Sequence, residues 1–446
     1  MKTSRGRILT THAGSLPRTD KLAKLLIERD NDVPVDEGEL RREIESATDW
    51  VVAKQLDSGV DVGNDGEEAR VGFQTYASIR LSGWGGVSPR KRTTDIVKFP
   101  KYGEILRRRV ARPGELTAKL FNCFQCQRAV RYQPDLADAK LELQSFADSL
   151  ARSPRKFTET FVTAASPGII STTFLRDDNN PDYRTDKEYV YGVARAMKNE
   201  YDYIVSQGHI LQLDAPDLAM ERSFMFQDRP LGEFLDRIKI HIDAMNLALA
   251  DIPPEKVRLH VCFGNWDGPH IDDVDLAPLL PIVYRAKVGA ISIACANPRH
   301  QHEWKTLKKN PPPRGMILIP GVIDVTTNYL EHPEVVADRI ALFVDVMGGD
   351  PSRVIAGTDC GFSTVTGFAM VAEDVVWAKL RTLADGARIA SRRLKAGPKG
   401  KPVAGAGAAS TERRAPSKAG KRRAKKEKAP RRRKEAAVGG RGQARR

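Results

Sequence analysis

Apolar residues recur along the chain with two alternating periods, one typical of helices and one typical of strands. Segments in which apolar residues return every three or four positions are predicted helices: 39–54, 186–206, 231–250, 273–286, 333–347 and 366–391. Short apolar or alternating runs between them are predicted strands: 60–62, 209–213, 256–262, 289–293, 316–323 and 353–357. The turn at Gly59 ends the first helix, and Asp186 is expected to cap the second.

This repetition of strand and helix is typical of a parallel sheet whose strands are joined by crossover helices. The length of 446 residues and the number of repeats favour a closed barrel over an open sheet. No Gly-rich phosphate or dinucleotide loop follows the first predicted strand, which argues against a Rossmann fold. The sequence therefore predicts an α/β protein built on a (β/α)8 TIM barrel.

A sharp change of composition near Gly397 and Pro398 divides the chain into a barrel, residues 1–397, and a tail, residues 398–446. Residues 399–446 hold 18 Lys and Arg against 3 Asp and Glu, which accounts for the whole net charge of +15. A segment so poor in large apolar residues is expected to be disordered. It is expected to attract nucleic acid weakly and non-specifically, although a dedicated nucleic-acid function stays open. It has no aromatic residue on which bases could stack.

Membrane and secretory functions are not expected from this sequence. It has no apolar run of the roughly 18–20 residues that a membrane-spanning helix requires. The basic residues after Met1 are not followed by the apolar segment of a signal peptide. Five cysteines, an odd number in so long a chain, do not indicate a disulfide framework. We therefore expect a cytoplasmic protein with reduced thiols; its oligomeric state is left open.

Metal-ligating residues stand at the ends of two predicted strands. His260 and Cys262 are two residues apart, so both side chains point to the same side of their strand. Cys360 follows the strand at 353–357. Active sites of TIM barrels are built at the carboxyl ends of the strands, and one imidazole with two thiolates suits Zn2+. Three protein ligands would leave a fourth position open for a substrate. The alternative is a buried histidine with two inert buried cysteines.

Acidic residues also follow predicted strands. Glu67, Asp214 and Asp324 each come at or just after a strand end. Carboxylates gathered at a barrel mouth can hold a substrate ammonium group or a proton. The alternative is that each caps a helix or forms a salt bridge at the start of a loop.

The chain resembles the C-terminal catalytic barrel of cobalamin-independent methionine synthase and the related zinc-dependent thiol alkyltransferases. The resemblance covers roughly residues 8–390. It rests on segments that occur in this order, all near strand ends: Thr-Thr-His-Ala-Gly-Ser-Leu-Pro-Arg at 10–18, Asp-Val-Gly-Asn-Asp-Gly-Glu at 61–67, Leu-Gln-Leu-Asp-Ala-Pro at 211–216, His-Val-Cys at 260–262, Ala-Asn-Pro-Arg-His at 296–300 and Asp-Cys-Gly at 359–361.

The resemblance implies zinc bound by His260, Cys262 and Cys360, with no cobalamin. It also implies that Gly14, Ser15, Glu67 and Asp214 hold the amino-acid part of homocysteine. The zinc-bound thiol would then attack the methyl group of a methylated folate, 5-methyltetrahydrofolate or its polyglutamate, and give methionine. Metal coordination favours this chemistry because a free thiol, with a pKa of ~8.5, is deprotonated when it binds a metal.

Two positions depart from the family pattern. The synthases have a glutamate zinc ligand where this chain has Ala294, so either three ligands suffice or Cys295 substitutes. They also have a histidine, thought to protonate the leaving folate nitrogen, two residues after the position of Asp324; here that residue is Thr326. Asp324 and Thr326 are therefore weak catalytic candidates, and these departures put the methylfolate donor in doubt.

Further pocket candidates are His12, Trp266, Arg299 and His300, each with aromatic packing or helix capping as the alternative. The leading hypothesis is a zinc-dependent S-methyltransferase that acts on a small-molecule thiol and a methyl donor. The second is a related alkyltransferase acting on another thiol or an epoxide-like electrophile. The third is an inactive barrel tethered to nucleic acid by its basic tail. The lone Cys-x-x-Cys at Cys123 and Cys126 is expected to be structural.

Overall fold

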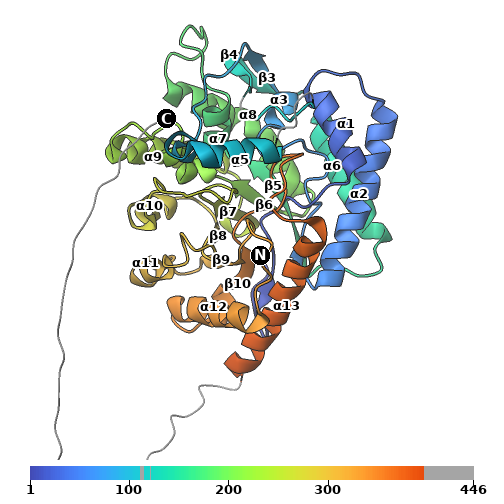
Figure 1. The fold of residues 1–446 in the computed structure, drawn as a ribbon, viewed down its shortest axis with the longest axis vertical. Helices are drawn as coiled ribbons and strands as arrows, with labels where there is room; N and C mark the ends of the chain where they lie inside the picture. Colours follow the sequence, from blue (N-terminus) through green and yellow to red (C-terminus); the bar gives the residue numbers. More distant parts are fainter. Residues whose placement is uncertain (111–114, 121, 396–446) are drawn as a thin grey trace, which may run out of the picture. The chain divides into compact units, whose positions relative to one another are not determined.

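The computed structural model describes residues 1–110, 115–120 and 122–395. The disorder predicted for 398–446 lies outside these residues. Eight parallel strands follow one another in the order β1-β10-β9-β8-β7-β6-β5-β2, and a bridge between Thr11 and Val62 brings the two edges together. The chain therefore forms the predicted TIM barrel (Figure 1). Its strands are β1 Leu9–Thr10, β2 Val62–Gly63, β5 Glu159–Ala165, β6 Ile210–Asp214, β7 Val257–Val261, β8 Ala290–Ile293, β9 Ile317–Ile323 and β10 Ile355–Thr358.

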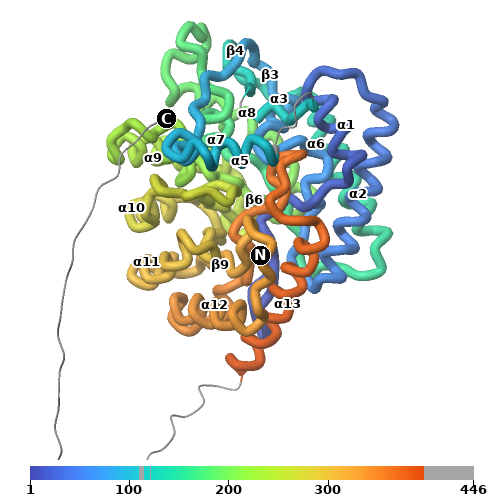
Figure 2. The backbone as a smooth tube through the Cα atoms, in the orientation of Figure 1, coloured from blue at the N-terminus to red at the C-terminus, as the bar shows by residue number. Residues whose placement is uncertain are grey.

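Helices surround this barrel, and α13 packs beside α12 and α2 to close the ring (Figure 2). Among the described residues the α-helices are α1 Asp20–Asp30, α2 Glu37–Ser58, α3 Ala77–Arg80, α4 Thr94–Lys98, α5 Pro100–Val110, α6 Ala137–Arg152, α7 Pro167–Thr173, α8 Asp186–Ser206, α9 Leu231–Ala248, α10 Leu276–Val283, α11 Trp304–Lys309, α12 Pro333–Val346 and α13 Glu373–Lys395. None of them is both long and apolar enough to cross a membrane.

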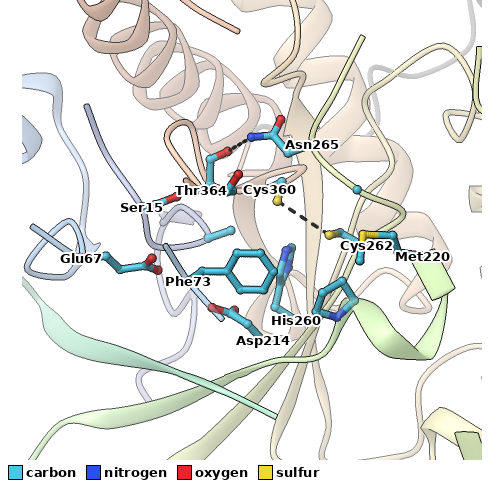
Figure 3. Close-up of a pocket in the computed structure, with 14 residues that line it drawn as sticks. Ser15, Glu67, Phe73, Asp214, Met220, His260, Cys262, Asn265, Cys360 and Thr364 are labelled. Atoms are coloured by element: carbon cyan, nitrogen blue, oxygen red, sulfur yellow. Dashed lines mark hydrogen bonds between the residues drawn. The ribbon is translucent and has the colours of Figure 1, made fainter. Parts of the chain in front are cut away.

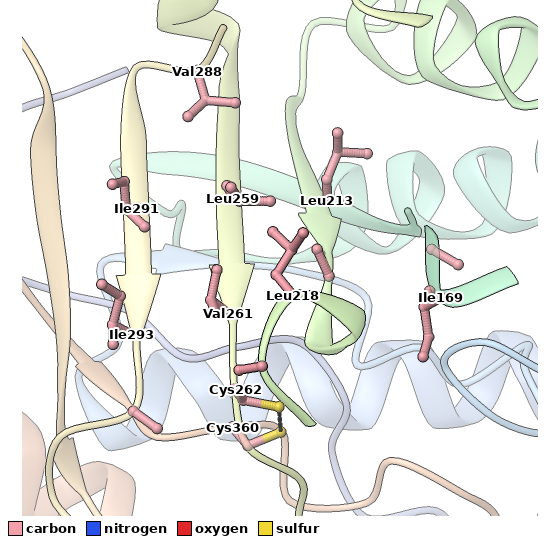
Figure 4. Packing of buried hydrophobic residues seen from close by; sticks show 14 of the residues in the cluster. Ile169, Leu213, Leu218, Leu259, Val261, Cys262, Val288, Ile291, Ile293 and Cys360 are labelled. Carbon is pink, nitrogen blue, oxygen red and sulfur yellow. Dashed lines mark hydrogen bonds between the residues drawn. The ribbon is translucent and has the colours of Figure 1, made fainter. Parts of the chain in front are cut away.

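Strand residues alternate between the helix layer and the barrel interior. Leu259 and Val261 of β7 pack with Leu213 of β6 and with Ile291 and Ile293 of β8 in the main apolar cluster (Figure 4). The alternate positions of β7 are polar, which is why its sequence mixes charged and apolar residues. A second, smaller apolar cluster joins residues near the strand starts: Leu9, Ala290, Ile317, Ile319 and Ile355. The carboxyl end of the barrel is thereby left for polar side chains.

Two details of the predicted helices are wrong. The residue that caps α8 is Thr185 rather than Asp186, because the Thr185 hydroxyl accepts a hydrogen bond from the backbone N–H of Glu188. The last helix begins at Glu373 instead of at 366. The preceding residues turn through Gly367, whose φ is +82°, and the Thr366 N–H binds the carbonyl oxygen of Val71.

The predicted strands are found with shifts of one or two residues, whereas four strands were not predicted. β1 has only two residues, too few for a periodic signal. β5 is a barrel strand of seven residues. The other two, β3 Leu81–Gly85 and β4 Gln125–Tyr132, form an antiparallel hairpin in a long excursion between β2 and β5.

Candidate metal centre and substrate pocket

A pocket of about 410 Å³, which includes space open to solvent, lies at the carboxyl ends of the strands. It brings together side chains from five barrel strands or the loops that follow them, and Figure 3 shows how these side chains face one another. Its lining residues are Ala13, Ser15, Glu67, Phe73, Asp214, Pro216, Met220, His260, Cys262, Gly264, Asn265, Cys360, Gly361 and Thr364. The pocket thus combines metal-ligating, acidic and apolar side chains.

His260, Cys262 and Cys360 form a cluster that could hold a metal ion. One ligand atom from each lies within 4.8 Å of the others, and the two sulfur atoms are 3.7 Å apart. All three side chains are buried. The Cys360 thiol donates to Cys262, so the pKa of Cys262 falls well below its usual value while that of Cys360 rises. Burial lowers the pKa of His260, but Cys262 and Asp214 raise it more, so the net shift is upward.

The cluster fits a cation by its donor chemistry. His260 Nε2 is buried without a hydrogen-bond partner, while Nδ1 lies 3.3 Å from the hydroxyl oxygen of Ser292. A buried ring nitrogen beside two sulfur atoms is a soft donor set, the kind that zinc prefers. A hydrogen-bond partner at the other ring nitrogen fixes the orientation of a ligating imidazole, and the Ser292 hydroxyl lies at that position.

Asp359, which the sequence analysis did not single out, holds the loops around the cluster. Its carboxylate accepts hydrogen bonds from the backbone N–H groups of Cys295, Ala296 and Asn297 at 2.7–2.8 Å, and from the Asn297 amide at 2.9 Å. Burial raises its pKa to about 6. These bonds fasten the end of β8 to the end of β10 and so fix the backbone next to Cys360. The sequence signal that could have found Asp359 was its place directly before Cys360 in the Asp-Cys-Gly motif.

Glu67 and Asp214 face the same pocket and are both buried. Glu67 Oε1 accepts from the Thr163 hydroxyl at 3.0 Å, and Oε2 is buried without a partner. Asp214 Oδ1 accepts from the Gln212 amide at 2.6 Å. Burial raises the pKa of both carboxyl groups; that of Asp214, raised further by the charge of Glu67, reaches about 7. Two carboxylates so placed provide a site for a cationic group.

The Gly14-Ser15 turn packs directly on these groups. A Cβ atom on Gly14, whose φ is +131°, would lie 2.4 Å from Glu67 Oε1 and 2.7 Å from Thr163. Ser15 lines the pocket, and its carbonyl oxygen accepts from the backbone N–H of Phe362. A residue larger than glycine at position 14 would therefore displace the carboxylate of Glu67.

The structure does not bring Cys295, Asp324 or Thr326 into this pocket. Cys295 is buried, outside the three-residue cluster, and burial raises the pKa of its thiol well above the usual value. Both oxygens of the Asp324 carboxylate accept hydrogen bonds from its own loop, from Thr326 and Thr327. The Thr326 hydroxyl is a donor in one of these bonds, at 2.9 Å.

Of the other four pocket candidates, three are buried and engaged with neighbouring side chains, and the fourth is exposed. His12 donates to Gln55 through Nε2 and accepts from the Gly14 N–H through Nδ1, and burial lowers its pKa to about 4. The Trp266 indole donates to Asp95 at 3.1 Å. His300 stacks on Phe263 and lies 2.8 Å from Asp273, whereas Arg299 is exposed. None of these four is among the lining residues.

Five lining residues were missed by the sequence analysis: Phe73, Met220, Gly264, Asn265 and Thr364. Asn265 is the most informative, because its Nδ2 donates to the Gly361 carbonyl oxygen at 2.8 Å and its buried Oδ1 has no partner. It thereby ties the loop after Cys262 to the loop after Cys360. Its place three residues after Cys262 was the signal that could have found it.

Fold and site together define a TIM barrel with a His/Cys/Cys cluster at its mouth. No family model matches. The chain is 22% identical over 388 residues to the methionine synthase of Sulfurisphaera tokodaii, covering 86% of this chain and 93% of the relative. It is 23% identical over 270 residues to 2-hydroxypropyl-CoM lyase of Xanthobacter autotrophicus, covering 55% of this chain and 65% of that protein.

The fold is also that of a solved structure, the B12-independent methionine synthase of Shewanella sp. W3-18-1. The TM-score is 0.62 at 20% identity, over 87% of this chain and 99% of that one. In sequence the chain is similar to cobalamin-independent methionine synthases and, more distantly, to 2-hydroxypropyl-CoM lyase.

Proposed function

We propose that this protein transfers a methyl group from 5-methyltetrahydrofolate, or its polyglutamate, to the thiol of homocysteine, with zinc at His260, Cys262 and Cys360. The observation that carries the proposal is the presence of two buried carboxylates, Glu67 and Asp214, in the same pocket as the His/Cys/Cys cluster. One part of the pocket suits a thiol, and the other suits an ammonium group.

Zinc held by one imidazole and two thiolates would lower the pKa of a substrate thiol and keep its sulfur nucleophilic. His260, Cys262 and Cys360 supply the donors, and Ser292 orients His260. In the reaction the bond between the methyl carbon and the folate nitrogen breaks as the new carbon–sulfur bond forms. The thiol proton is lost, and the folate nitrogen takes up a proton.

Glu67 and Asp214 would bind the α-ammonium group of homocysteine, and Ser15 would contact the amino-acid part of the same molecule. Because both carboxyl groups are buried, an ammonium ion would remove much of the electrostatic cost of ionising them. Phe73, Pro216 and Met220 would exclude water from the reacting atoms. A thiol that carries a negative tail in place of the amine would be repelled at the same place.

No side chain in the described part of the pocket takes the role of the synthase histidine. Thr326 is bonded to Asp324, and a hydroxyl group is a poor acid at neutral pH. The proton for the folate nitrogen would therefore come from solvent.

A second candidate function follows from Ala294 and Thr326. A transferase that joins another thiol to an epoxide-like electrophile needs neither the glutamate ligand nor the histidine. The similarity to 2-hydroxypropyl-CoM lyase, a relative at 23% identity, favours it. The third hypothesis, an inactive barrel, predicts a protein without bound zinc.

The test begins with elemental analysis and calorimetric titration of the zinc-loaded protein. We expect one zinc per chain and tighter binding of homocysteine than of 4-mercaptobutanoate, which lacks the amine. Asp214→Asn should weaken homocysteine binding by about ten- to hundredfold, the range expected for a charged hydrogen bond, and leave 4-mercaptobutanoate unchanged. Asp61→Asn, at the opposite end of the barrel, is the matched control.

Methyl transfer is then measured with 5-methyltetrahydrofolate and, separately, alkylation with epoxypropane. Methionine formed from homocysteine and methylfolate supports the first proposal. Turnover of an epoxide without methionine formation would select the second. Protein that binds no zinc and no thiol would contradict both.

A further inference from the structure

A buried arginine lies one layer below the pocket. Arg258 precedes His260 by two residues on β7, so its side chain also points into the barrel, and it is 2% exposed. Its guanidinium donates to three neutral groups: Nε to Gln212 Oε1 at 2.7 Å, Nη1 to the Thr11 hydroxyl at 3.0 Å and Nη2 to the His12 carbonyl oxygen at 2.8 Å. Its face covers the Phe161 ring, 3.5 Å from the centroid.

Gln212 connects this arginine to the pocket. Its Nε2 donates to Asp214 Oδ1 and to the Ala13 carbonyl oxygen, both at 2.6 Å. A guanidinium N–H can only donate. Arg258 therefore holds the Gln212 amide with its oxygen toward the guanidinium and its NH2 group toward Asp214. The Gln212 side chain is 0% exposed, and all of its bonds serve these three partners.

The same two side chains fix the other wall of the pocket. Arg258 binds the carbonyl oxygen of His12, and Gln212 binds that of Ala13. These carbonyl groups immediately precede the Gly14-Ser15 turn. One guanidinium therefore controls, directly or through one amide, the backbone before Ser15 and the orientation of Asp214.

We propose that Arg258 is a positioning residue that, through Gln212, sets the selectivity of the pocket for thiols that carry an amine. The inference rests on the proposed function, since it concerns the same pocket. With Oδ1 of Asp214 occupied by Gln212, the other oxygen is left for the ammonium group. Without Arg258 the amide can turn over and present its own oxygen to the carboxylate, which repels it.

The cation itself supports this role. Burying a guanidinium among neutral partners is costly, and burial lowers the pKa of Arg258 to about 9, although Asp214 and Glu159 oppose this from a distance. A long apolar side chain could fill the same volume without that cost. Only a group that offers several fixed donors can hold Gln212, Thr11 and the His12 carbonyl together.

The experiment compares two variants with the unmodified protein, all loaded with zinc. Arg258→Met removes the donors at similar length. Gln212→Glu keeps a partner for Arg258 but takes the donor away from Asp214. Binding of homocysteine and of 4-mercaptobutanoate is measured by calorimetry, with zinc content and far-ultraviolet circular dichroism as checks on folding. Arg353→Met is the control, because Arg353 also binds backbone carbonyl groups, at the opposite end of the barrel.

Both variants should bind homocysteine at least about tenfold more weakly and 4-mercaptobutanoate within about twofold of the unmodified protein. Arg353→Met should preserve the preference. If Gln212→Glu folds, binds zinc and still prefers homocysteine to 4-mercaptobutanoate, the inference about Arg258 is overturned while the proposed function stands. Equal weakening of both thiols would also overturn it, since that indicates a merely structural role. An unmodified protein with no preference for the amine would overturn the proposed function and the inference with it.

Discussion

Buried carboxylates in this protein have pKa values shifted in opposite directions, downward for Glu142 and upward for Glu67 and Asp214. Glu142 of α6 is 2% exposed and forms ion pairs with Arg70, at 2.6 Å, and with Arg80. Glu67 and Asp214 are equally buried, but their partners in the pocket are neutral, Thr163 and Gln212. Burial raises the pKa of Glu142, yet the two guanidinium groups outweigh it and bring the value to about 2, whereas Asp214 reaches about 7.

The difference indicates which carboxylates serve the fold and which are available to a ligand. Arg70 reaches Glu67 only through Thr163, whose hydroxyl accepts from Arg70 and donates to Glu67. The fixed cations are thus used one layer away from the pocket. Among the described residues no cationic side chain bonds to either carboxylate of the pocket, so the pocket is suited to a cation that arrives with the substrate.

The largest effect is expected from Cys360→Ser, which removes one of the three ligands of the metal cluster. The same substitution at a buried cysteine outside the cluster is the comparison. A serine hydroxyl is a poor zinc ligand, so bound zinc should fall to near zero. Methyl transfer to the thiol should fall by more than about a hundredfold, which exceeds the loss that removal of a residue supporting a ligand typically causes. Zinc by elemental analysis and turnover by product formation are the measurements. Cys126→Ser, far along the chain and buried, should retain both.

Cys295→Ser sharpens the same experiment. Cys295 lies outside the cluster in the structure, so this variant should retain zinc. Loss of zinc from Cys295→Ser together with its retention in Cys360→Ser would show that the ligand set has been assigned to the wrong cysteine.

The next largest effect tests the comparison of carboxylates directly. Glu142→Gln leaves Arg70 and Arg80 without their shared anion, and breaking a buried ion pair typically costs about 3–5 kcal/mol. Asp214→Asn removes a carboxylate with only neutral partners, so the free energy of unfolding should change by less than about 1 kcal/mol. Urea unfolding of both variants gives the two values. Equal losses in the two variants would mean that Glu142 and Asp214 contribute alike to the stability of the fold.

The smallest effect is the pH dependence of the Glu142 contribution. The pKa of Glu142 is about 2 in the folded protein and 4.5 when unperturbed, so its stabilisation is complete above about pH 4.5 and is lost as the pH falls toward 2. The stability difference between the unmodified protein and Glu142→Gln should therefore shrink by roughly 1–3 kcal/mol between pH 7 and pH 3. A stability difference that stays constant over this range would mean that Arg70 and Arg80 do not lower the pKa of Glu142.

The sequence by itself determined the fold class, because runs of apolar residues at strand and helix periods survive in a buried parallel barrel. It also indicated that His260 and Cys262 share one side of a strand, since that follows from local geometry alone. The convergence of Cys360 on them, the hairpin β3–β4 and the contacts of Asp359 and Asn265 were decided by the tertiary structure. So was the engagement of His12, Trp266 and His300 in packing. Each of these depends on residues far apart in the chain, and the polar layer of Arg258 and Gln212 exists only when the barrel closes around it.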